Sequence, residues 1–260
     1  MAALVVLLLV PGLAVAGIAD RVASTFALMA NDFVAAFKPI DALVVSVEGD
    51  EIFLDVTEAS GAQVGQEYTI YRKGDTFMHP VTGRALGRYE TVLGYAQVVR
   101  IYPQFVAAHF VQNEAAPRPR STDGARITRA RIRVAITPTL DMTSARADLR
   151  RVPFLLAAAL EGSKRFLAVD PLAVSDMFAG GSVRVEEVLA RPERAVRAAR
   201  QLEVQGWVVS MLLERRGVTY LDVTYISAIT GNALFSRRLP LVAASATEDQ
   251  RFPWEPRPED

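Results

Sequence analysis

Cysteine is absent from this chain of 260 residues. Its absence excludes disulfide bridges, a thiol nucleophile, thiolate metal ligands and a lipid-modified cysteine anchor. Only two histidines occur, His79 and His109, and neither has a second candidate ligand at a spacing typical of metal sites. A Gly-x-Ser-x-Gly nucleophile elbow is also missing. The sequence therefore predicts no catalytic residue, no cofactor and no metal, and we expect a protein that is not an enzyme.

Charge is missing from the first nineteen residues. An apolar run at 4–10 leads into Pro11-Gly12 and then into Ala14-Val15-Ala16, the core, helix break and cleavage pattern of a secretory signal. We therefore expect a signal peptide at residues 1–16 and a periplasmic protein. No Lys or Arg precedes the run, so an uncleaved membrane anchor stays open, because eighteen apolar residues just span about 30 Å of hydrocarbon.

The formal net charge is zero, but the charges are unevenly distributed. Residues 17–117 hold seven Lys/Arg against twelve Asp/Glu, and residues 118–260 hold twenty-two against seventeen. Halves of opposite charge favour either packing on one another or head-to-tail assembly, with chance scatter as the alternative explanation.

An amphipathic helix is predicted over residues 20–38. Its apolar side chains recur every three or four residues and share one face: Val22, Phe26, Met29, Phe33 and Phe37. Lys38-Pro39 ends it, since the residue before proline leaves the helical region. Phe26, Phe33 and Phe37 either bind a partner or a membrane surface, or cover the protein's own sheet, which is the more frequent use of such a stripe.

The remaining pattern predicts an α+β protein with two folded parts. Period-two alternation with glycine at the turns indicates a small SH3-like β-barrel, and mixed patterns after it indicate an α/β sandwich whose single mixed sheet carries helices on one face. The expected segments are a helix at 17–39, the barrel at 40–114, a proline-bearing linker at 115–125, the α/β domain at 126–243 and a disordered tail at 244–260.

Arginines cluster around the linker, and they are candidate partner-binding residues: Arg118, Arg120, Arg126, Arg129 and Arg131. No aromatic residues are interleaved to stack bases, so nucleic acid is not expected. The run forms either a solvated sheet face or a surface for an acidic partner. In the tail, Phe252 and Trp254 are the residues expected to anchor on a neighbour.

Two stretches resemble known families. Residues 45–54, 64–72 and 79–87 resemble the SH3-like barrel of the flagellar assembly protein T family. Residues 155–161, 165–170, 195–202 and 220–231 resemble the periplasmic domain shared by the curli secretion channel CsgG, the TolB N-terminal domain and the middle domain of flagellar assembly protein T. The order differs, because here the barrel precedes the α/β domain.

The resemblance implies a non-catalytic structural or assembly protein of a cell-envelope machine, and most specifically a ring component of the flagellar motor. Its expected partners are copies of itself and other envelope-machine proteins, with peripheral contact to the outer membrane and no small-molecule substrate. The alternative is a periplasmic adaptor or binding module of an export or polysaccharide secretion system.

Overall fold

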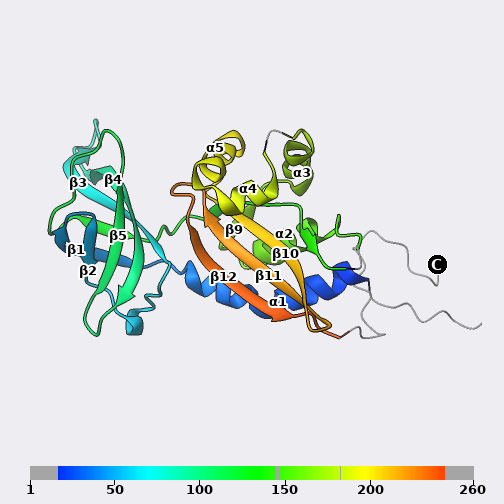
Figure 1. Ribbon diagram of the computed structural model, residues 1–260. Coiled ribbons are helices and arrows are strands. Elements are labelled where there is room, and N and C mark those ends of the chain that lie inside the picture. The colour runs from blue at the N-terminus through cyan, green and yellow to red at the C-terminus, as the bar shows by residue number, and fades with distance from the viewer. Residues whose placement is uncertain (1–16, 145–146, 182, 244–260) are drawn as a thin grey trace, which may run out of the picture.

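The structure is a computed structural model that describes residues 17–144, 147–181 and 183–243. The predicted leader and tail, including Phe252 and Trp254, lie outside the described residues. A β-barrel and a larger α/β domain lie side by side (Figure 1). The predicted α+β class is confirmed.

The barrel is closed, and its strands follow the order β1-β2-β5-β4-β3-β6. In β1, Ala42 and Val44 are buried while Leu43 and Val45 face outward, which is the alternation of a half-buried strand. The strands are β1 (Asp41–Glu48), β2 (Glu51–Leu54), β3 (Glu67–Met78), β4 (Ala85–Ile101), β5 (Val106–Gln112) and β6 (Gly124–Arg126), with a short 3₁₀ helix at Glu58–Ser60.

Strand β6 lies where the sequence predicted the end of a linker. It pairs antiparallel with both β1 and β3 and so closes the barrel. Three residues are too few to show an alternating pattern, and only the pairing partners identify the segment as a strand. Gly124 packs under Tyr71, where an added Cβ would lie 2.3 Å from the ring.

The α/β domain holds a six-stranded mixed sheet with the path β12-β11-β10-β7-β9, and β8 pairs with β10. Strands β7 and β10 are parallel, whereas β10, β11 and β12 form an antiparallel meander. The strands are β7 (Ile132–Ile136), β8 (Leu140–Met142), β9 (Phe166–Ala168), β10 (Gly206–Arg215), β11 (Val218–Ser227) and β12 (Ala233–Pro240). The helices are α1 (Ile18–Ala36), α2 (Val152–Gly162), α3 (Pro171–Ala179), α4 (Val185–Ala190) and α5 (Pro192–Leu202).

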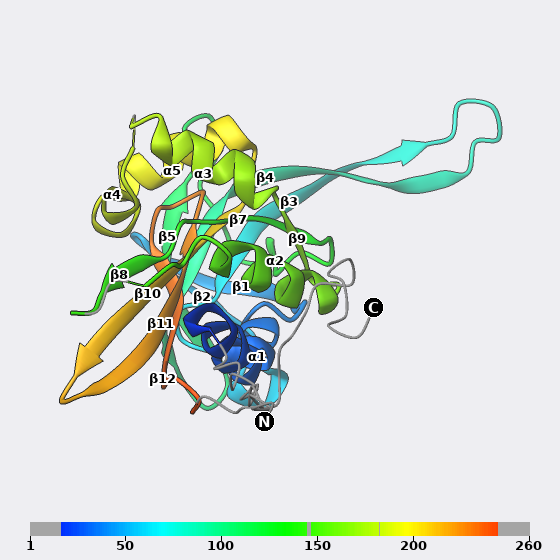
Figure 2. The same ribbon diagram turned by 90° about the vertical axis from the view of Figure 1, so that its right-hand side faces the viewer.

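Helices cover both faces of this sheet rather than the one face predicted (Figures 1 and 2). Val134 and Val208 pack in a core with α1 and α2, whereas Ala135 and Trp207 pack in a second core with α3, α4 and α5. Successive strand residues point to opposite faces, and here both sets are apolar. The indole Nε1 of Trp207 donates to the Ala195 carbonyl at 3.0 Å, which satisfies the polar atom of a fully buried side chain.

Helix α3 was not predicted, although its start carries two recognisable signals. The Asp170 carboxylate accepts a hydrogen bond from the Leu172 N–H at 2.9 Å, as an N-cap does, and Pro171 occupies the first turn. Helix α2 begins at Val152, with Pro153 in its first turn.

Helix α1 belongs to the α/β domain although the barrel separates them in the sequence. Its apolar face contributes Val22, Phe26, Met29 and Phe33, all fully buried, to the core beneath the sheet. Phe33 meets Phe235 of β12 edge to face at 4.7 Å between ring centroids. The barrel is therefore an excursion of the chain between α1 and β7. Across the described ranges, no helix combines the length and the apolar character that a membrane crossing requires.

One guanidinium holds both ends of this excursion. Arg165, which is 8% exposed, donates from Nε to the Phe37 carbonyl at 2.7 Å, and from Nη1 and Nη2 to the carbonyls of Ala130 and Thr128, each at 2.6 Å. Phe37 ends α1, and residues 128 and 130 lead into β7.

Replacing Arg165 with Met is expected to lower the free energy of unfolding by about 3 kcal/mol, because three buried carbonyls lose a charged donor. Urea titration followed by circular dichroism measures the change. The matched control is Arg150→Met, which removes an exposed arginine paired only with exposed Asp148 and should leave the midpoint nearly unchanged. An equal midpoint for both variants would show that Arg165 does not stabilise the fold.

Candidate functional site

Strands β3 and β4 continue beyond the barrel as a two-stranded arm, defined here as residues 73–91 (Figure 2). Lys73 pairs with Glu90 near its base and Met78 with Ala85 near its tip. Every residue of the arm is exposed except His79, which is partly buried. The arm therefore extends into solvent, and no other element among the described residues covers it.

The tip of the arm is an ordered turn. The Nδ1 atom of His79 accepts hydrogen bonds from the backbone N–H groups of Val81 and Thr82, at 3.1 and 3.2 Å. The His79 N–H donates to the Arg84 carbonyl, and the Gly83 N–H donates back to the His79 carbonyl. Gly83 has φ +63°, a conformation that glycine adopts without strain. His79 thus has a structural role in shaping the tip.

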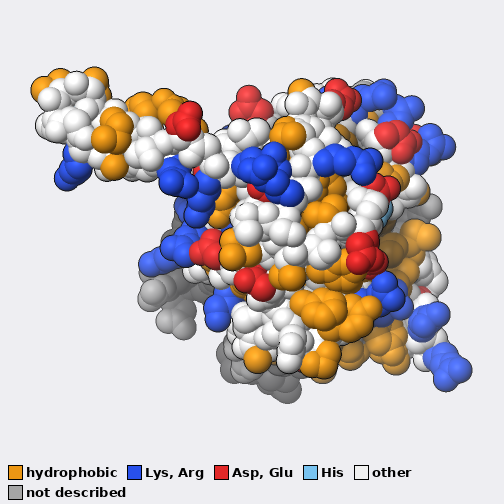
Figure 3. Space-filling model, turned by 90° about the vertical axis from the view of Figure 1, so that its left-hand side faces the viewer, with side chains coloured by type: hydrophobic (Ala, Val, Ile, Leu, Met, Phe, Trp, Pro, Cys, Tyr) orange, Lys and Arg blue, Asp and Glu red, His pale blue; other side chains and the backbone are white. Residues whose placement is uncertain are grey.

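Apolar side chains are concentrated on this exposed arm. The rings of Phe77 and Tyr89 meet edge to face at 5.3 Å, and each remains well exposed. The exposed fractions are Phe77 44%, Met78 49%, Val81 87%, Leu86 47% and Tyr89 59%. Figure 3 shows apolar side chains gathered on the projecting arm. A two-stranded ribbon gains little stability by itself, so a cluster of exposed apolar residues on one is a candidate interaction surface.

The sequence-based prediction missed the arm because it assigned residues 40–114 as a whole to a small barrel. A signal was present: strand-forming residues flank Thr82-Gly83 on both sides. Alternation alone does not reveal that these strands extend beyond the barrel, because exposed and buried strands have the same two-residue period.

The predicted partner-binding phenylalanines lie inside the protein. Phe26 and Phe33 are fully buried and Phe37 is 7% exposed. Phe37 packs against Phe166 and Tyr225, with ring centroids 5.6 and 4.3 Å apart. Their expected contact with a partner or membrane is incompatible with this burial, because the helix stripe covers the protein's own sheet.

The predicted arginine cluster is dispersed by contacts within the chain. Arg126 pairs with Glu90 at 2.6 Å and lies over the Tyr71 ring, and Arg129 pairs with Asp41. Arg131 donates to the Phe166 carbonyl at 2.7 Å. Arg118 and Arg120 remain exposed beside the barrel. Binding of an acidic partner by the exposed pair stays a prediction.

Neither histidine lies in a metal-binding arrangement within residues 17–144, 147–181 and 183–243, where no group of three His, Asp or Glu side chains is placed to hold an ion. His109 is exposed on β5 rather than in the barrel interior.

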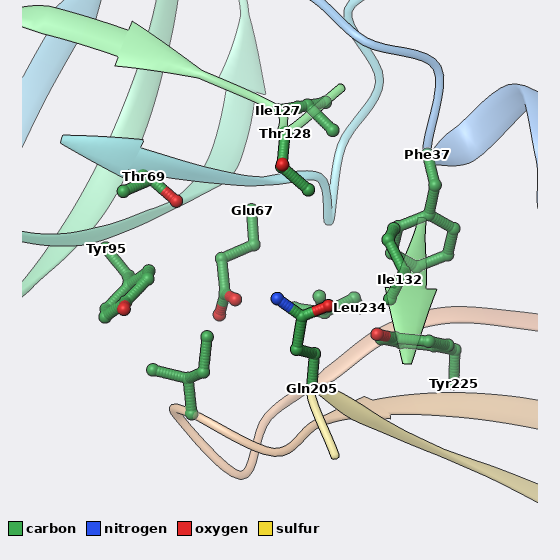
Figure 4. A pocket seen from close by; sticks show the side chains of 11 residues that line it. Phe37, Glu67, Thr69, Tyr95, Ile127, Thr128, Ile132, Gln205, Tyr225 and Leu234 are labelled. Atoms are coloured by element: carbon green, nitrogen blue, oxygen red, sulfur yellow. The ribbon is translucent and has the colours of Figure 1, made fainter. Parts of the chain in front are cut away.

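A small cavity of about 120 Å³ lies at the junction of the barrel and the α/β domain, and Figure 4 shows its lining. The Glu67 carboxylate accepts hydrogen bonds from Ser227 Oγ at 3.0 Å and Thr230 Oγ1 at 2.9 Å, and so links β3 to the turn before β12. Burial raises the pKa of Glu67, while the two hydroxyl donors oppose that rise. Burial also raises the pKa of Tyr95, and the nearby Glu67 charge adds to that rise.

Further contacts fix the junction. The amide of Gln66 donates to the Ala36 carbonyl at the end of α1 and to Gly61, each at 3.1 Å. Gly65 has φ +91°, and a Cβ there would lie 2.1 Å from the Leu234 carbonyl oxygen. The loop before β3 therefore presses directly on β12. This dense set of contacts identifies the cavity as part of a structural joint between the two domains.

No protein-family model and no curated protein matches the chain. Solved structures resemble part of it. The LpoB C-terminal domain from Escherichia coli is 16% identical, with a TM-score of 0.36 over 45% of this chain and 85% of that one. The NMR structure of E. coli LpoB is 15% identical, with a TM-score of 0.37 over 43% of this chain and 56% of that one. Lipoprotein GNA1162 from Neisseria meningitidis is 10% identical, with a TM-score of 0.36 over 46% of this chain and 86% of that one. At these TM-scores the similarities carry no conclusion about this chain's partners.

The predicted membership in a flagellar assembly protein T-like family, with its CsgG/TolB-type second domain, is wrong. No family model matches, and the similar solved structures are LpoB and GNA1162 rather than flagellar proteins. The predicted role in a flagellar motor ring is wrong with it. Alternating short strands and glycine turns are shared by many small barrels, so this pattern does not identify one family.

Replacing Glu67 with Gln is expected to flatten the pH dependence of stability. A carboxyl whose pKa is higher in the folded state than in the unfolded chain stabilises the fold at low pH, and that contribution is lost as pH rises above about 4.5 through the raised value. The free energy of unfolding of the variant should therefore rise relative to that of the wild type between pH 5 and pH 8. Urea unfolding midpoints measured at each pH report this difference. The control Glu114→Gln, in an exposed loop, should show the same dependence of stability on pH as the wild type. Identical pH profiles for all three proteins would contradict a raised pKa of Glu67 in the folded state.

Proposed function

We propose that this chain is a non-catalytic protein of the cell envelope that acts through contacts with other proteins, and that the arm is its contact element. The observation that carries the proposal is the arm, where five large apolar side chains lie in solvent on a ribbon that projects from a closed barrel. The charge-free leader pattern at 1–16 supports an exported protein.

The arm suits recognition because it is presented from a rigid base. Its strands are continuous with β3 and β4, which pair on both sides within the barrel, and its tip turn is hydrogen-bonded. A preorganised apolar tip binds with a smaller loss of conformational entropy than a flexible loop. Aromatic residues such as Phe77 and Tyr89 are also typical anchors of protein interfaces.

A periplasmic adaptor of an export or polysaccharide secretion system remains the second form of this proposal. Both forms use protein contacts and differ in whether the partner is another copy of the chain or one defined envelope protein. The identity of the proteins that copurify with the wild-type chain, whose arm is intact, distinguishes the two forms.

Replacing Phe77 and Tyr89 together with Ser is expected to reduce recovery of envelope partners at least tenfold in an affinity purification from crosslinked cell envelopes, read by quantitative mass spectrometry. Both side chains are exposed, so the unfolding midpoint should hardly change. The matched control replaces Leu28 and Val64, which are 66% and 62% exposed away from the arm, with Ser. Equal partner recovery by both double variants would exclude the arm as the contact element.

A further inference from the structure

The outer part of the arm carries positive charge alone. Both carboxylates of the arm lie toward its base, where Glu90 pairs with Arg126 of the barrel at 2.6 Å. Residues 76–89, which include the five exposed apolar side chains, contain Arg84 and Arg88 and no Asp or Glu. The apolar cluster is therefore accompanied by two positive charges that no carboxylate of the outer arm balances.

These two arginines differ from others on the barrel in being unpaired. Arg72, for example, pairs with Asp123 at 2.7 Å. Arg84 and Arg88 are exposed, and across the described residues no carboxylate forms an ion pair with either guanidinium. Their N–H donors are therefore available to an acceptor on another molecule.

The unpaired arginines flank the apolar side chains. Arg88 directly precedes Tyr89, whose ring meets that of Phe77 edge to face. Arg84 adjoins the turn at the tip, where its carbonyl accepts a backbone hydrogen bond. An apolar centre with polar and charged groups at its margin is the usual composition of a protein interface.

We propose that the arm binds a partner protein whose surface offers an apolar pocket with Asp or Glu side chains at its rim. Phe77 and Tyr89 enter the pocket, and Arg84 and Arg88 pair with the rim carboxylates. A guanidinium suits this task because its planar set of donors matches the two oxygens of a carboxylate. This inference rests on the proposed function and specifies the chemistry of the surface that the same arm binds.

The number of charges favours a protein over an anionic membrane as the target. Electrostatic recognition of anionic lipids takes a cluster of roughly four to eight Lys or Arg residues. The outer arm has two. Its turn is also fixed by hydrogen bonds to His79, which hold the side chains of the tip in set positions. A fixed arrangement gains more from a shaped pocket than from a fluid surface.

Two hollows on this chain lack the composition that the arm requires. The groove of about 470 Å³ between α2 and α3 contains Asp148, which already pairs with Arg150 at 2.6 Å. The hollow beside the β10–β11 turn is lined by Arg215 and Arg216, which would repel the arginines of the arm. Both observations favour a different protein over a second copy as the partner.

Carbodiimide crosslinking tests for carboxylates at the rim of the pocket. This reagent joins a lysine amine to a carboxylate in contact with it, and the chain has only three lysines of its own, Lys38, Lys73 and Lys164. The full-length chain with Arg84→Lys and Arg88→Lys is treated in cell envelopes, and its crosslinked peptides are identified by mass spectrometry. We expect both substituted positions to be joined to Asp or Glu residues of one envelope protein.

The matched control carries Arg215→Lys and Arg216→Lys, at the β10–β11 turn on the side of the molecule away from the arm (Figures 1 and 2). It should give at least tenfold fewer crosslinks to that protein. In the affinity purification described above, Arg84→Glu with Arg88→Glu should reduce partner recovery at least tenfold, because like charges then meet. Arg215→Glu with Arg216→Glu should leave recovery unchanged. All four positions are exposed, so the unfolding midpoints should stay close to that of the wild type.

Three results would overturn the inference. Equal crosslinking by the two lysine variants, or unchanged partner recovery by the Arg84→Glu, Arg88→Glu variant, would show that the rim is not acidic. A crosslinked dimer joined from the tip to a carboxylate of a second copy would identify the chain itself as the partner. Flotation of the wild type, but not of the Arg84→Glu, Arg88→Glu variant, with vesicles of phosphatidylglycerol and phosphatidylethanolamine would identify a membrane as the target.

Failure of the proposed function would look different. If the Phe77→Ser, Tyr89→Ser variant loses its envelope partners while the Arg84→Glu, Arg88→Glu variant keeps them, the arm is the contact element and only the acidic rim is excluded. If both variants keep their partners, the arm is not the contact element and both proposals are wrong.

Discussion

The bonds of one buried guanidinium to three backbone carbonyls hold together the two places where the chain crosses between its domains. The chain leaves the α/β domain at Phe37 and returns through residues 128–130, and Arg165 donates to the carbonyls at both places, between 2.6 and 2.7 Å. Its own backbone carbonyl accepts from the Ile132 N–H at the start of β7. Burial lowers the pKa of Arg165, but an arginine remains charged in a protein, so its five donors must find acceptors.

The rest of the junction adds shape and directional bonds to this anchor. Gly65 allows a barrel loop to touch the Leu234 carbonyl, and Gln66 binds the last turn of α1. Glu67 joins β3 to Ser227 and Thr230, and the amide of Gln97 reaches the Ala233 carbonyl at 3.1 Å. These contacts come from the loop before β3, the first residue of β3 and strand β4, and the two strands continue into the arm. The direction in which the arm points is therefore fixed by how the barrel is seated on the α/β domain.

Under the proposed function, this coupling fixes the direction in which a small barrel presents its contact element. A barrel has no free sheet edges, so its backbone offers no pairing surface. The extension of β3 and β4 carries apolar side chains well away from that closed surface and presents them on a hydrogen-bonded turn. The α/β domain contributes the opposite kind of surface, an open groove between α2 and α3.

The sequence by itself determined the local elements whose patterns are complete within a few residues. Spacings of three and four from Val22 to Phe37 predicted α1, and alternation around Val44, Ile52 and Val98 predicted barrel strands, because periodicity follows from backbone geometry. Only the tertiary structure decided what those elements face: the phenylalanines of α1 cover a sheet formed mainly by residues after position 131, and β6 became a strand through its partners. The arm was decided in the same way, since whether Phe77 and Tyr89 are buried or exposed depends on where the barrel closes. Burial is a property of contacts between distant segments, and no local pattern contains it.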